Sequence, residues 1–156
     1  MREVKPQMNA DKRSFKHSEL TSNVIKVFYE VYTELGHGFL ESVYAKSLQI
    51  ALIALGIKAQ LKIEVPVSFR GQNVGTFEAD MLVENCVLVE LKAVRAFEKA
   101  HEAQLLNYLR ATEIEVGLLL NFGVEPSIKR MAFDNARKVG GRKCLSIADL
   151  LEPDEG

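Results

Sequence analysis

Two neighbouring apolar runs carry charged residues where strands ordinarily place aliphatic side chains. The runs are Glu78–Val83 and Val87–Lys92, and the unexpected charges are Asp80, Glu90 and Lys92. Burying an unpaired charge costs several kcal/mol, so charges inside core strands need partners or a bound ion. A hard cation such as Mg²⁺ takes oxygen ligands, commonly one or two carboxylates with water and substrate phosphate. The pattern therefore favours phosphodiester chemistry at a metal site.

The turn between the two runs decides whether such a site can form. Side chains alternate along a strand, so Glu90 and Lys92 share a face. If Glu84–Cys86 is a three-residue loop, Asp80 falls opposite Glu90, within about 5.5 Å. A two-residue turn would place Asp80 opposite Val89 and break the site. The alternative is an edge hairpin with a solvated polar face, on which these charges are merely exposed.

Composition bounds the class of protein. The 156 residues, 47% hydrophobic and 26% charged, are typical of one globular domain. No apolar run approaches the roughly 20 residues that span a membrane, and Met1–Lys5 begins no signal peptide, so we expect a cytoplasmic protein without membrane association. Cys86 and Cys144, with three scattered histidines, make no zinc spacing and cannot form a four-cysteine iron–sulfur site.

The charges are distributed unevenly, although the net charge is only −1. Acidic residues gather between positions 78 and 102, and a basic segment follows from 129 to 143. An acidic metal site beside a basic surface suits a phosphate backbone. The candidate nucleic-acid contacts are Lys129, Arg130, Arg137 and Lys138. Each cluster could equally be a solvated face.

Hydrophobic periodicity predicts the order of the elements. After a mobile arm over 1–17, helical spacing predicts a helix from Ser18 and a second one ending near Gly56. Alternation from Leu61 to Phe69 predicts a strand, and Pro66 indicates that this strand is an edge or carries a bulge. The remaining predicted elements are a strand around Val74–Val83, a strand ending at Lys92, a helix over Phe97–Thr112, a buried strand over Val116–Phe122, a short helix or irregular segment over Pro126–Val139, and a terminal strand or turn at Leu145–Leu151.

This order, helix–helix–strand–strand–strand–helix–strand, predicts an α/β fold with a mixed central sheet flanked by helices. We expect one domain over 18–151 and a frayed tail over 152–156.

Polar residues on the predicted helices add to the candidates. Glu41 lies three residues before Tyr44, on the apolar stripe of the second helix. It could equally be a carboxylate that is favourable in the first helical turn, near the positive end of the helix dipole. Gln104 and Tyr108, four residues apart, share a face of the later helix with His101, as a site or as a hydrogen-bonded polar rim.

Together these residues resemble a known group of enzymes. Asp80 followed by Glu90-Leu91-Lys92 resembles the PD-(D/E)XK nuclease superfamily, with Ala79 in place of the proline of its name. The resemblance covers about residues 18–130 and implies a restriction-endonuclease-like core.

Two further motifs narrow the resemblance. Gln104–Tyr108 resembles the QxxxY helix motif of the recombination-exonuclease branch, and Gly38–Tyr44 matches the motif that names the bacterial GxxExxY family. The metal ligands that the resemblance implies, for Mg²⁺ or Mn²⁺, are Asp80, Glu90, the Leu91 carbonyl and Glu41. Lys92 would orient or deprotonate the attacking water and stabilise charge on the phosphate, while Gln104 and Tyr108 would position the lysine and the nucleic-acid backbone.

The function that the resemblance implies is metal-dependent hydrolysis of phosphodiester bonds, with DNA as the favoured substrate over RNA. No base-stacking motif or helix-turn-helix is evident, so we expect low sequence specificity. The alternatives are a non-catalytic nucleic-acid-binding module, or an interaction protein that docks on a larger complex; a homodimer is also open. The intact set of Asp80, Glu90 and Lys92 favours the enzyme.

Overall fold

The computed structural model of the chain describes residues 17–138. Its elements, in chain order, are α2 (Ser18–Leu35), α3 (Glu41–Ala54), β1 (Ala59–Phe69), β2 (Gln72–Val83), β3 (Val87–Lys92), α4 (Lys99–Ala111), β4 (Val116–Asn121), β5 (Ser127–Ala132) and the 3-10 turn η1 (Asn135–Arg137). Except for His17, the predicted N-terminal arm lies outside the described residues. The predicted element at 145–151 and the C-terminal tail lie outside them as well.

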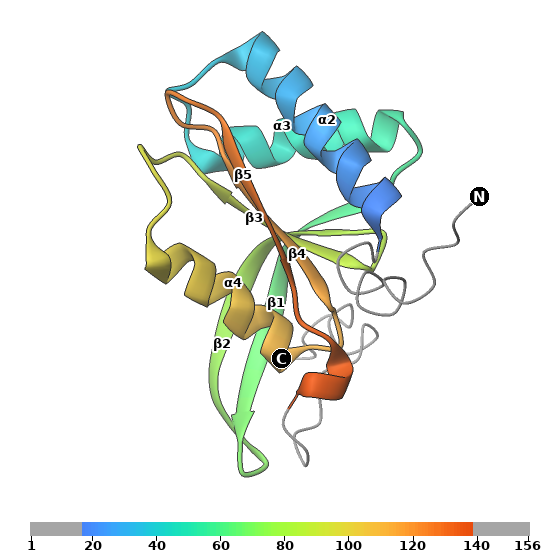
Figure 1. Cartoon of the computed structure of the whole chain (residues 1–156), viewed down its shortest axis with the longest axis vertical. Helices are drawn as coiled ribbons and strands as arrows, with labels where there is room; N and C mark the ends of the chain where they lie inside the picture. The colour runs from blue at the N-terminus through green and yellow to red at the C-terminus, as the bar shows by residue number, and fades with distance from the viewer. Residues whose placement is uncertain (1–16, 139–156) are drawn as a thin grey trace, which may run out of the picture.

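The strands form one mixed sheet in the order β1-β2-β3-β4-β5 (Figure 1). β3 and β4 pair in parallel, while the other neighbours are antiparallel. A parallel pair needs a crossover connection, and α4 supplies it. The structure confirms the α/β class and the predicted mixed central sheet.

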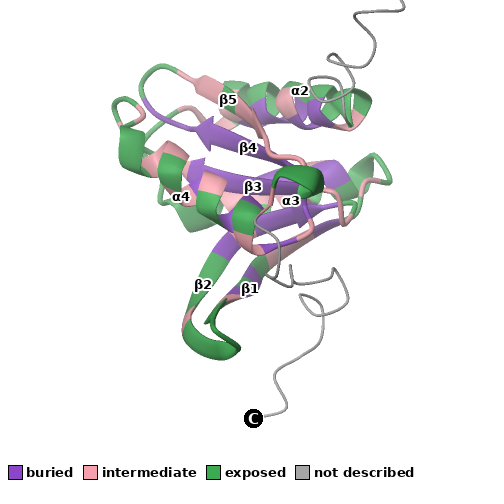
Figure 2. Cartoon of the chain, turned by 60° about the horizontal axis from the view of Figure 1, so that its bottom comes forward, coloured by how far each residue is buried: buried purple, intermediate pink, exposed green. Residues whose placement is uncertain are grey.

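Helices cover both faces of this sheet. Val89 and Leu91 of β3 point into a core that α2 and α3 close with Phe28 and Leu48, among others. The intervening Leu88 points into the second core, which α4 closes with Leu105 and its neighbours. β3 and β4 are therefore buried through the centre of the molecule, as Figure 2 shows.

β1 is an edge strand, as Pro66 predicted, and its ladder with β2 also shifts between Val67 and Ser68. The β1–β2 hairpin runs well beyond the rest of the sheet (Figures 1 and 2). β2 pairs with β1 almost to the turn, but it pairs with β3 only from Met81 to Val83. The far part of the hairpin is therefore a two-stranded ribbon.

One predicted element was wrong. The segment Ser127–Ala132 was expected to be a short helix or irregular, but it is strand β5, antiparallel to β4. Its side chains are mostly half-buried, with Ile128 packed against one core and Met131 against the other. Edge pairing of this kind does not require strict alternation of apolar and polar residues. Within residues 17–138, no helix is both long and apolar enough to cross a membrane.

Candidate active site

The connection between β2 and β3 has the three residues that the site requires. Val83 pairs with Val87, and Met81 pairs with Val89. Glu84 and Asn85 both adopt positive φ, at 50° and 55°, which turns the chain within this short loop. The same register continued by one residue places Asp80 opposite Glu90, as predicted for a three-residue loop.

The carboxylates of Asp80 and Glu90 each accept a hydrogen bond from the main chain of the opposite strand. The Asp80 amide donates a hydrogen bond of 3.0 Å to Glu90 Oε1, and the Leu91 amide donates one of 2.7 Å to Asp80 Oδ2. These side-chain bonds occur one step beyond Met81, where the main-chain ladder between the strands ends. The structure therefore brings both carboxylates to the point at which β2 separates from β3.

The regular alternation of side chains between the two faces of the sheet is interrupted in β1, at the level of Asp80 and Glu90. Lys62, which the β1–β2 register would place opposite Asp80, has a positive φ of 57° and forms no ladder pair. On either side of it, Leu61 packs against the α2–α3 core and Ile63 against the α4 core. In a regular strand these two residues would share a face. The distortion therefore lies in β1, next to the part of β2 that carries Asp80.

Burial and repulsion from Asp80 set the protonation of Glu90. Glu90 is only 3% exposed, and burial, followed by the charge of Asp80, raises its pKa to about 8, against the weaker effect of Lys92. Burial, and then the charge of Glu90, raises the pKa of Tyr108 to about 12. Without a cation, Glu90 therefore keeps its proton near neutral pH, and Tyr108 stays a neutral phenol.

α4 reaches the remaining member of the motif. Lys92 Nζ donates to Gln104 Oε1 at 3.4 Å, and Gln104 Nε2 donates to Tyr108 Oη at 3.0 Å. Lys92 is two residues beyond Glu90 on β3, so both side chains belong to the face that α4 covers. The structure thus brings Lys92, Gln104 and Tyr108 together beside the carboxylate pair.

Glu41 is the first residue of α3 and is exposed. Within residues 17–138, no three His, Cys, Asp or Glu side chains gather closely enough to hold a metal ion. The structure therefore does not join Glu41 to Asp80 and Glu90 in a three-carboxylate cluster. Its role as a ligand, like that of the Leu91 carbonyl, stays a prediction.

Tyr44, the last residue of the motif that contains Glu41, fixes the start of α3. Its ring stacks on Phe122, with centroids 4.1 Å apart and an interplanar angle of 11°. Its hydroxyl donates to Gly36 O at 2.6 Å and accepts from the Phe39 amide at 3.2 Å. The Phe122 amide in turn donates to Lys92 O at 2.7 Å. The beginning of α3 is thereby attached to the end of β3.

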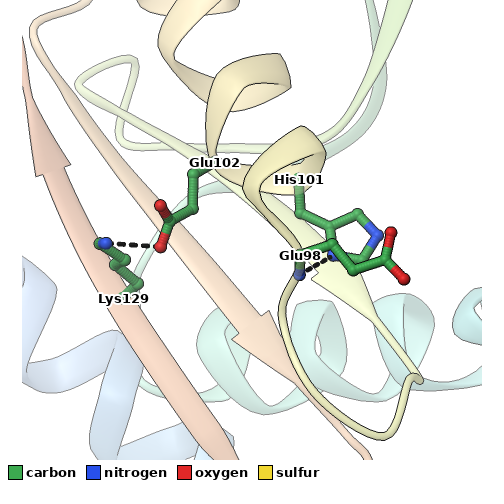
Figure 3. A network of polar contacts seen from close by, with 4 residues as sticks. All are labelled: Glu98, His101, Glu102 and Lys129. Carbon is green, nitrogen blue, oxygen red and sulfur yellow. Dashed lines mark hydrogen bonds and ion pairs between the residues drawn. The ribbon is translucent and has the colours of Figure 1, made fainter.

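The basic candidates on β5 point to opposite faces of the sheet, because Lys129 and Arg130 are consecutive in a strand. Lys129 lies on the α4 side and pairs with Glu102 at 2.5 Å (Figure 3). In the same figure, the Glu98 amide donates to His101 Nδ1 at 3.1 Å, at the start of α4. Burial lowers the pKa of Arg130. Of these two cations, Lys129 is the one on the face of Glu90.

The other two basic candidates lie near the beginning of β4, whereas Lys92 lies beside its end. Lys138 Nζ donates to Thr112 O at 2.5 Å and to Ile114 O at 3.0 Å. The Arg137 guanidinium lies 5.0 Å above the ring of Phe133. Both side chains therefore contribute to the fold at the end of α4, and the structure does not bring them next to Lys92.

Two residues were not identified from the sequence. The buried Asn121, at the end of β4, accepts from the Val94 amide at 2.9 Å and donates to Val94 O at 2.8 Å. A Cβ atom on Gly123 would lie 2.2 Å from Val94 O, so only glycine fits there. The available signal was an amide side chain within the apolar run from Val116 to Phe122.

Comparison with known proteins identifies the family to which this chain belongs. A family model described as the PD-(D/E)XK nuclease superfamily matches residues 18–131. The chain belongs to the PD-(D/E)XK nuclease superfamily. No curated protein matches it. The crystal structure of SSO0001 is similar at 19% identity and a TM-score of 0.48, over 79% of this chain and 63% of that one. This chain thus spans less than two thirds of that structure.

PD-(D/E)XK nucleases usually use divalent metals, and the donor set fits one. Asp80 and Glu90 meet across two strands, and their repulsion contributes to the raised pKa of Glu90. A divalent cation between the carboxylates would remove this repulsion and favour the ionised form of Glu90. Carboxylate oxygens are also the ligands that Mg²⁺ and Mn²⁺ prefer.

Proposed function

We propose that this protein is a divalent-metal-dependent nuclease that hydrolyses phosphodiester bonds in DNA with low sequence specificity. The observation that carries the proposal is the reciprocal bonding of Asp80 and Glu90 at the end of their ladder, with Lys92 two residues further along β3. Hydrogen bonds through Gln104 and Tyr108 support the lysine from α4.

Each residue has a chemical role in this proposal. Asp80 and Glu90, with the Leu91 carbonyl and Glu41, would hold Mg²⁺ or Mn²⁺. Such an ion, when bound, neutralises phosphate charge and lowers the pKa of the attacking water. Lys92 orients that water and stabilises the negative charge that develops on the phosphate.

The residues on α4 keep this lysine in place. Gln104 accepts a hydrogen bond from Lys92 and cannot easily turn away, because its amide nitrogen is bound to Tyr108. Tyr108 remains a neutral phenol at any physiological pH, since its pKa is raised to about 12. The hydrogen bond between Gln104 and Tyr108 therefore keeps the same protons throughout the physiological pH range.

Lys129 is proposed as the phosphate contact nearest to the site. Glu90 and Lys129 both pair with Leu119 of β4, from its two sides. Neighbouring strands are about 4.8 Å apart, so the two main chains lie about 10 Å from each other on this face. Arg130, Arg137 and Lys138 are proposed as more distant contacts to the backbone of a long substrate.

One observation favours a second candidate function, a nucleic-acid-binding module without catalysis. Asp80 and Glu90 each use an oxygen to bind a main-chain amide, and no three-ligand cluster exists among residues 17–138. In such a module the two carboxylates would serve only to join β2 to β3.

A cleavage screen separates the two functions. Linear, nicked, branched and single-stranded DNA, with matched RNA, are incubated with Mg²⁺ or Mn²⁺ and with EDTA. The nuclease proposal expects metal-dependent products that disappear with EDTA and with Lys92→Ala. Binding without cleavage of any substrate would support the non-catalytic module, and cleavage of RNA alone would change the proposed substrate.

A further inference from the structure

The segment that follows Lys92 is locked to the end of β4. The Phe122 amide binds Lys92 O at 2.7 Å, and the Asn121 side chain binds both main-chain groups of Val94, at 2.9 and 2.8 Å. Three hydrogen bonds therefore hold Lys92 and Val94, the two ends of the three-residue segment that leads out of the proposed active site.

This lock leaves the segment little freedom to move. Asn121 is fully buried, so a movement that removed its partners would leave a polar amide unsatisfied in the core, which is unfavourable. Gly123 packs so closely against the same carbonyl of Val94 that there is no room for a side chain on Gly123. The segment can shift only by breaking buried hydrogen bonds. The main chain that leads to the next residue therefore starts from a fixed position.

Arg95 is the next residue, and its side chain is exposed. Three peptide units separate it from Lys92, so the two Cα atoms are at most about 11 Å apart. In the part of the chain that the structure describes, no hydrogen bond, ion pair or ring contact involves its guanidinium. By contrast, Lys129 pairs with Glu102, and Lys138 binds main-chain carbonyls.

We propose that Arg95 binds a phosphate of the nucleic-acid substrate, and that Asn121 is the positioning residue that holds Arg95 for this contact. The proposal rests on the proposed function for its substrate. A polyanion that approaches Asp80 and Glu90 needs cations nearby, and a guanidinium binds phosphate in a planar, bidentate geometry. A fixed main chain lowers the entropy cost of the contact, because only the arginine side chain remains to be ordered.

Binding measured without turnover tests Arg95. The affinity of a fluorescein-labelled DNA oligonucleotide is measured by anisotropy in EDTA over a series of salt concentrations. Arg95→Ala should bind more weakly and flatten the plot of log affinity against log salt by about one unit. Arg95→Lys should recover the slope but not the full affinity, because it keeps the charge and loses the planar fork.

Arg70→Ala is the matched control. Arg70 is an exposed arginine in the β1–β2 turn, with its guanidinium 5.0 Å above Phe69, and it should keep the wild-type slope. A slope for Arg95→Ala equal to that of the wild type would overturn the proposal. So would equal losses for Arg95→Ala and Arg70→Ala, because these would indicate a general charge effect.

A double-variant comparison tests Asn121. Asn121→Asp keeps the shape and the acceptor but cannot donate to Val94 O, so it should loosen the segment. In this background, Arg95→Ala should change the salt slope by less than it does in the wild type. Gly123→Ala, which must displace Val94, should act in the same way and serves if Asn121→Asp does not fold. An undiminished effect of Arg95→Ala in a folded variant would remove Asn121 from the proposal.

The outcomes for binding and for cleavage are separable. If the wild type cleaves DNA and Arg95→Ala changes neither affinity nor slope, the inference fails and the nuclease proposal stands. If no substrate is cleaved but the slope changes as expected, the phosphate contact stands and the catalytic proposal fails. A wild type that binds no oligonucleotide in EDTA would overturn the inference, while the cleavage screen would still decide the nuclease proposal.

Discussion

The carboxylates of Asp80 and Glu90 are each hydrogen-bonded to a main-chain amide of the other residue's strand. The Asp80 amide donates to the Glu90 carboxylate, and the Asp80 carboxylate accepts from the amide that follows Glu90. The two side chains thereby replace main-chain pairing at the level where β2 separates from β3. A substitution at either position therefore alters both the proposed metal site and the junction of two strands.

Metal binding should stabilise the folded protein through Asp80. An ion at one hundred times its dissociation constant adds about 2.7 kcal/mol to the free energy of unfolding. Thermal melts of the wild type should shift upward with Mg²⁺ or Mn²⁺, and Asp80→Asn should lose most of the shift. Glu78→Gln, which removes an exposed carboxylate two residues away, should keep it. Equal shifts in Asp80→Asn and wild type would place the ion elsewhere.

The metal-free protein should lose stability as the pH rises from about 4.5 to about 8. The pKa of Glu90 is raised from 4.5 to about 8 in the folded state, mainly by burial. Over this window the folded state binds more protons than the unfolded state, so the free energy of unfolding falls with pH. Urea titrations in EDTA should show this contribution in the wild type and not in Glu90→Gln. The same slope in both proteins would mean that Glu90 ionises normally.

Lys92→Ala should reduce turnover without preventing binding. A group that stabilises charge only in the transition state typically contributes about 10²–10³-fold to the rate. Single-turnover cleavage should therefore slow by this factor at saturating enzyme, while the oligonucleotide affinity changes little. Lys46→Ala, on the exposed surface of α3, should cleave normally. Wild-type cleavage by Lys92→Ala would show that this lysine is only a solvated strand residue.

Lys129 and Arg130 should differ in their effect on binding, because they lie on opposite faces of β5. Lys129→Ala should weaken oligonucleotide binding and flatten its salt dependence by about one unit, with normal cleavage at saturation. Its pair with Glu102 is largely exposed, and such pairs are worth only about 0–1 kcal/mol, so phosphate can replace the carboxylate. Arg130→Ala, at the more distant proposed contact, should weaken binding less than Lys129→Ala does. A larger loss for Arg130→Ala would place the nucleic acid on the α2–α3 side.

Tyr44→Phe should destabilise the protein by about 1–3 kcal/mol. The substitution keeps the stack on Phe122 but leaves the Gly36 carbonyl and the Phe39 amide without the hydroxyl. Urea unfolding measures the change. Tyr29→Phe, at a residue 42% exposed, should unfold like the wild type. A Tyr44→Phe protein of wild-type stability would show that water replaces the hydroxyl at no cost.

The sequence limited the register of the site to two alternatives, because the loop could have two residues or three. The structure has the three-residue loop, which places Asp80 opposite Glu90. The distortion at Lys62 was not predictable, because analysis of periodicity assumes regular strands. Lysine also has no preference for positive φ that would have indicated the distortion. β5 was missed for a related reason: Lys129 and Arg130 interrupt its apolar residues, and pairing with β4 stabilises it as a half-buried edge.

The turn at the far end of the β1–β2 ribbon is a suitable site for attaching a label to this protein. Arg70 and Gly71 turn the chain there with φ of 50° and 79°, and a Cβ on Gly71 would meet no atom within 4 Å. Exposed loop tips of this kind tolerate added sequence. A fluorophore or short epitope grafted between these residues would project away from both cores, so the protein could be tracked or immobilised with its carboxylate pair undisturbed.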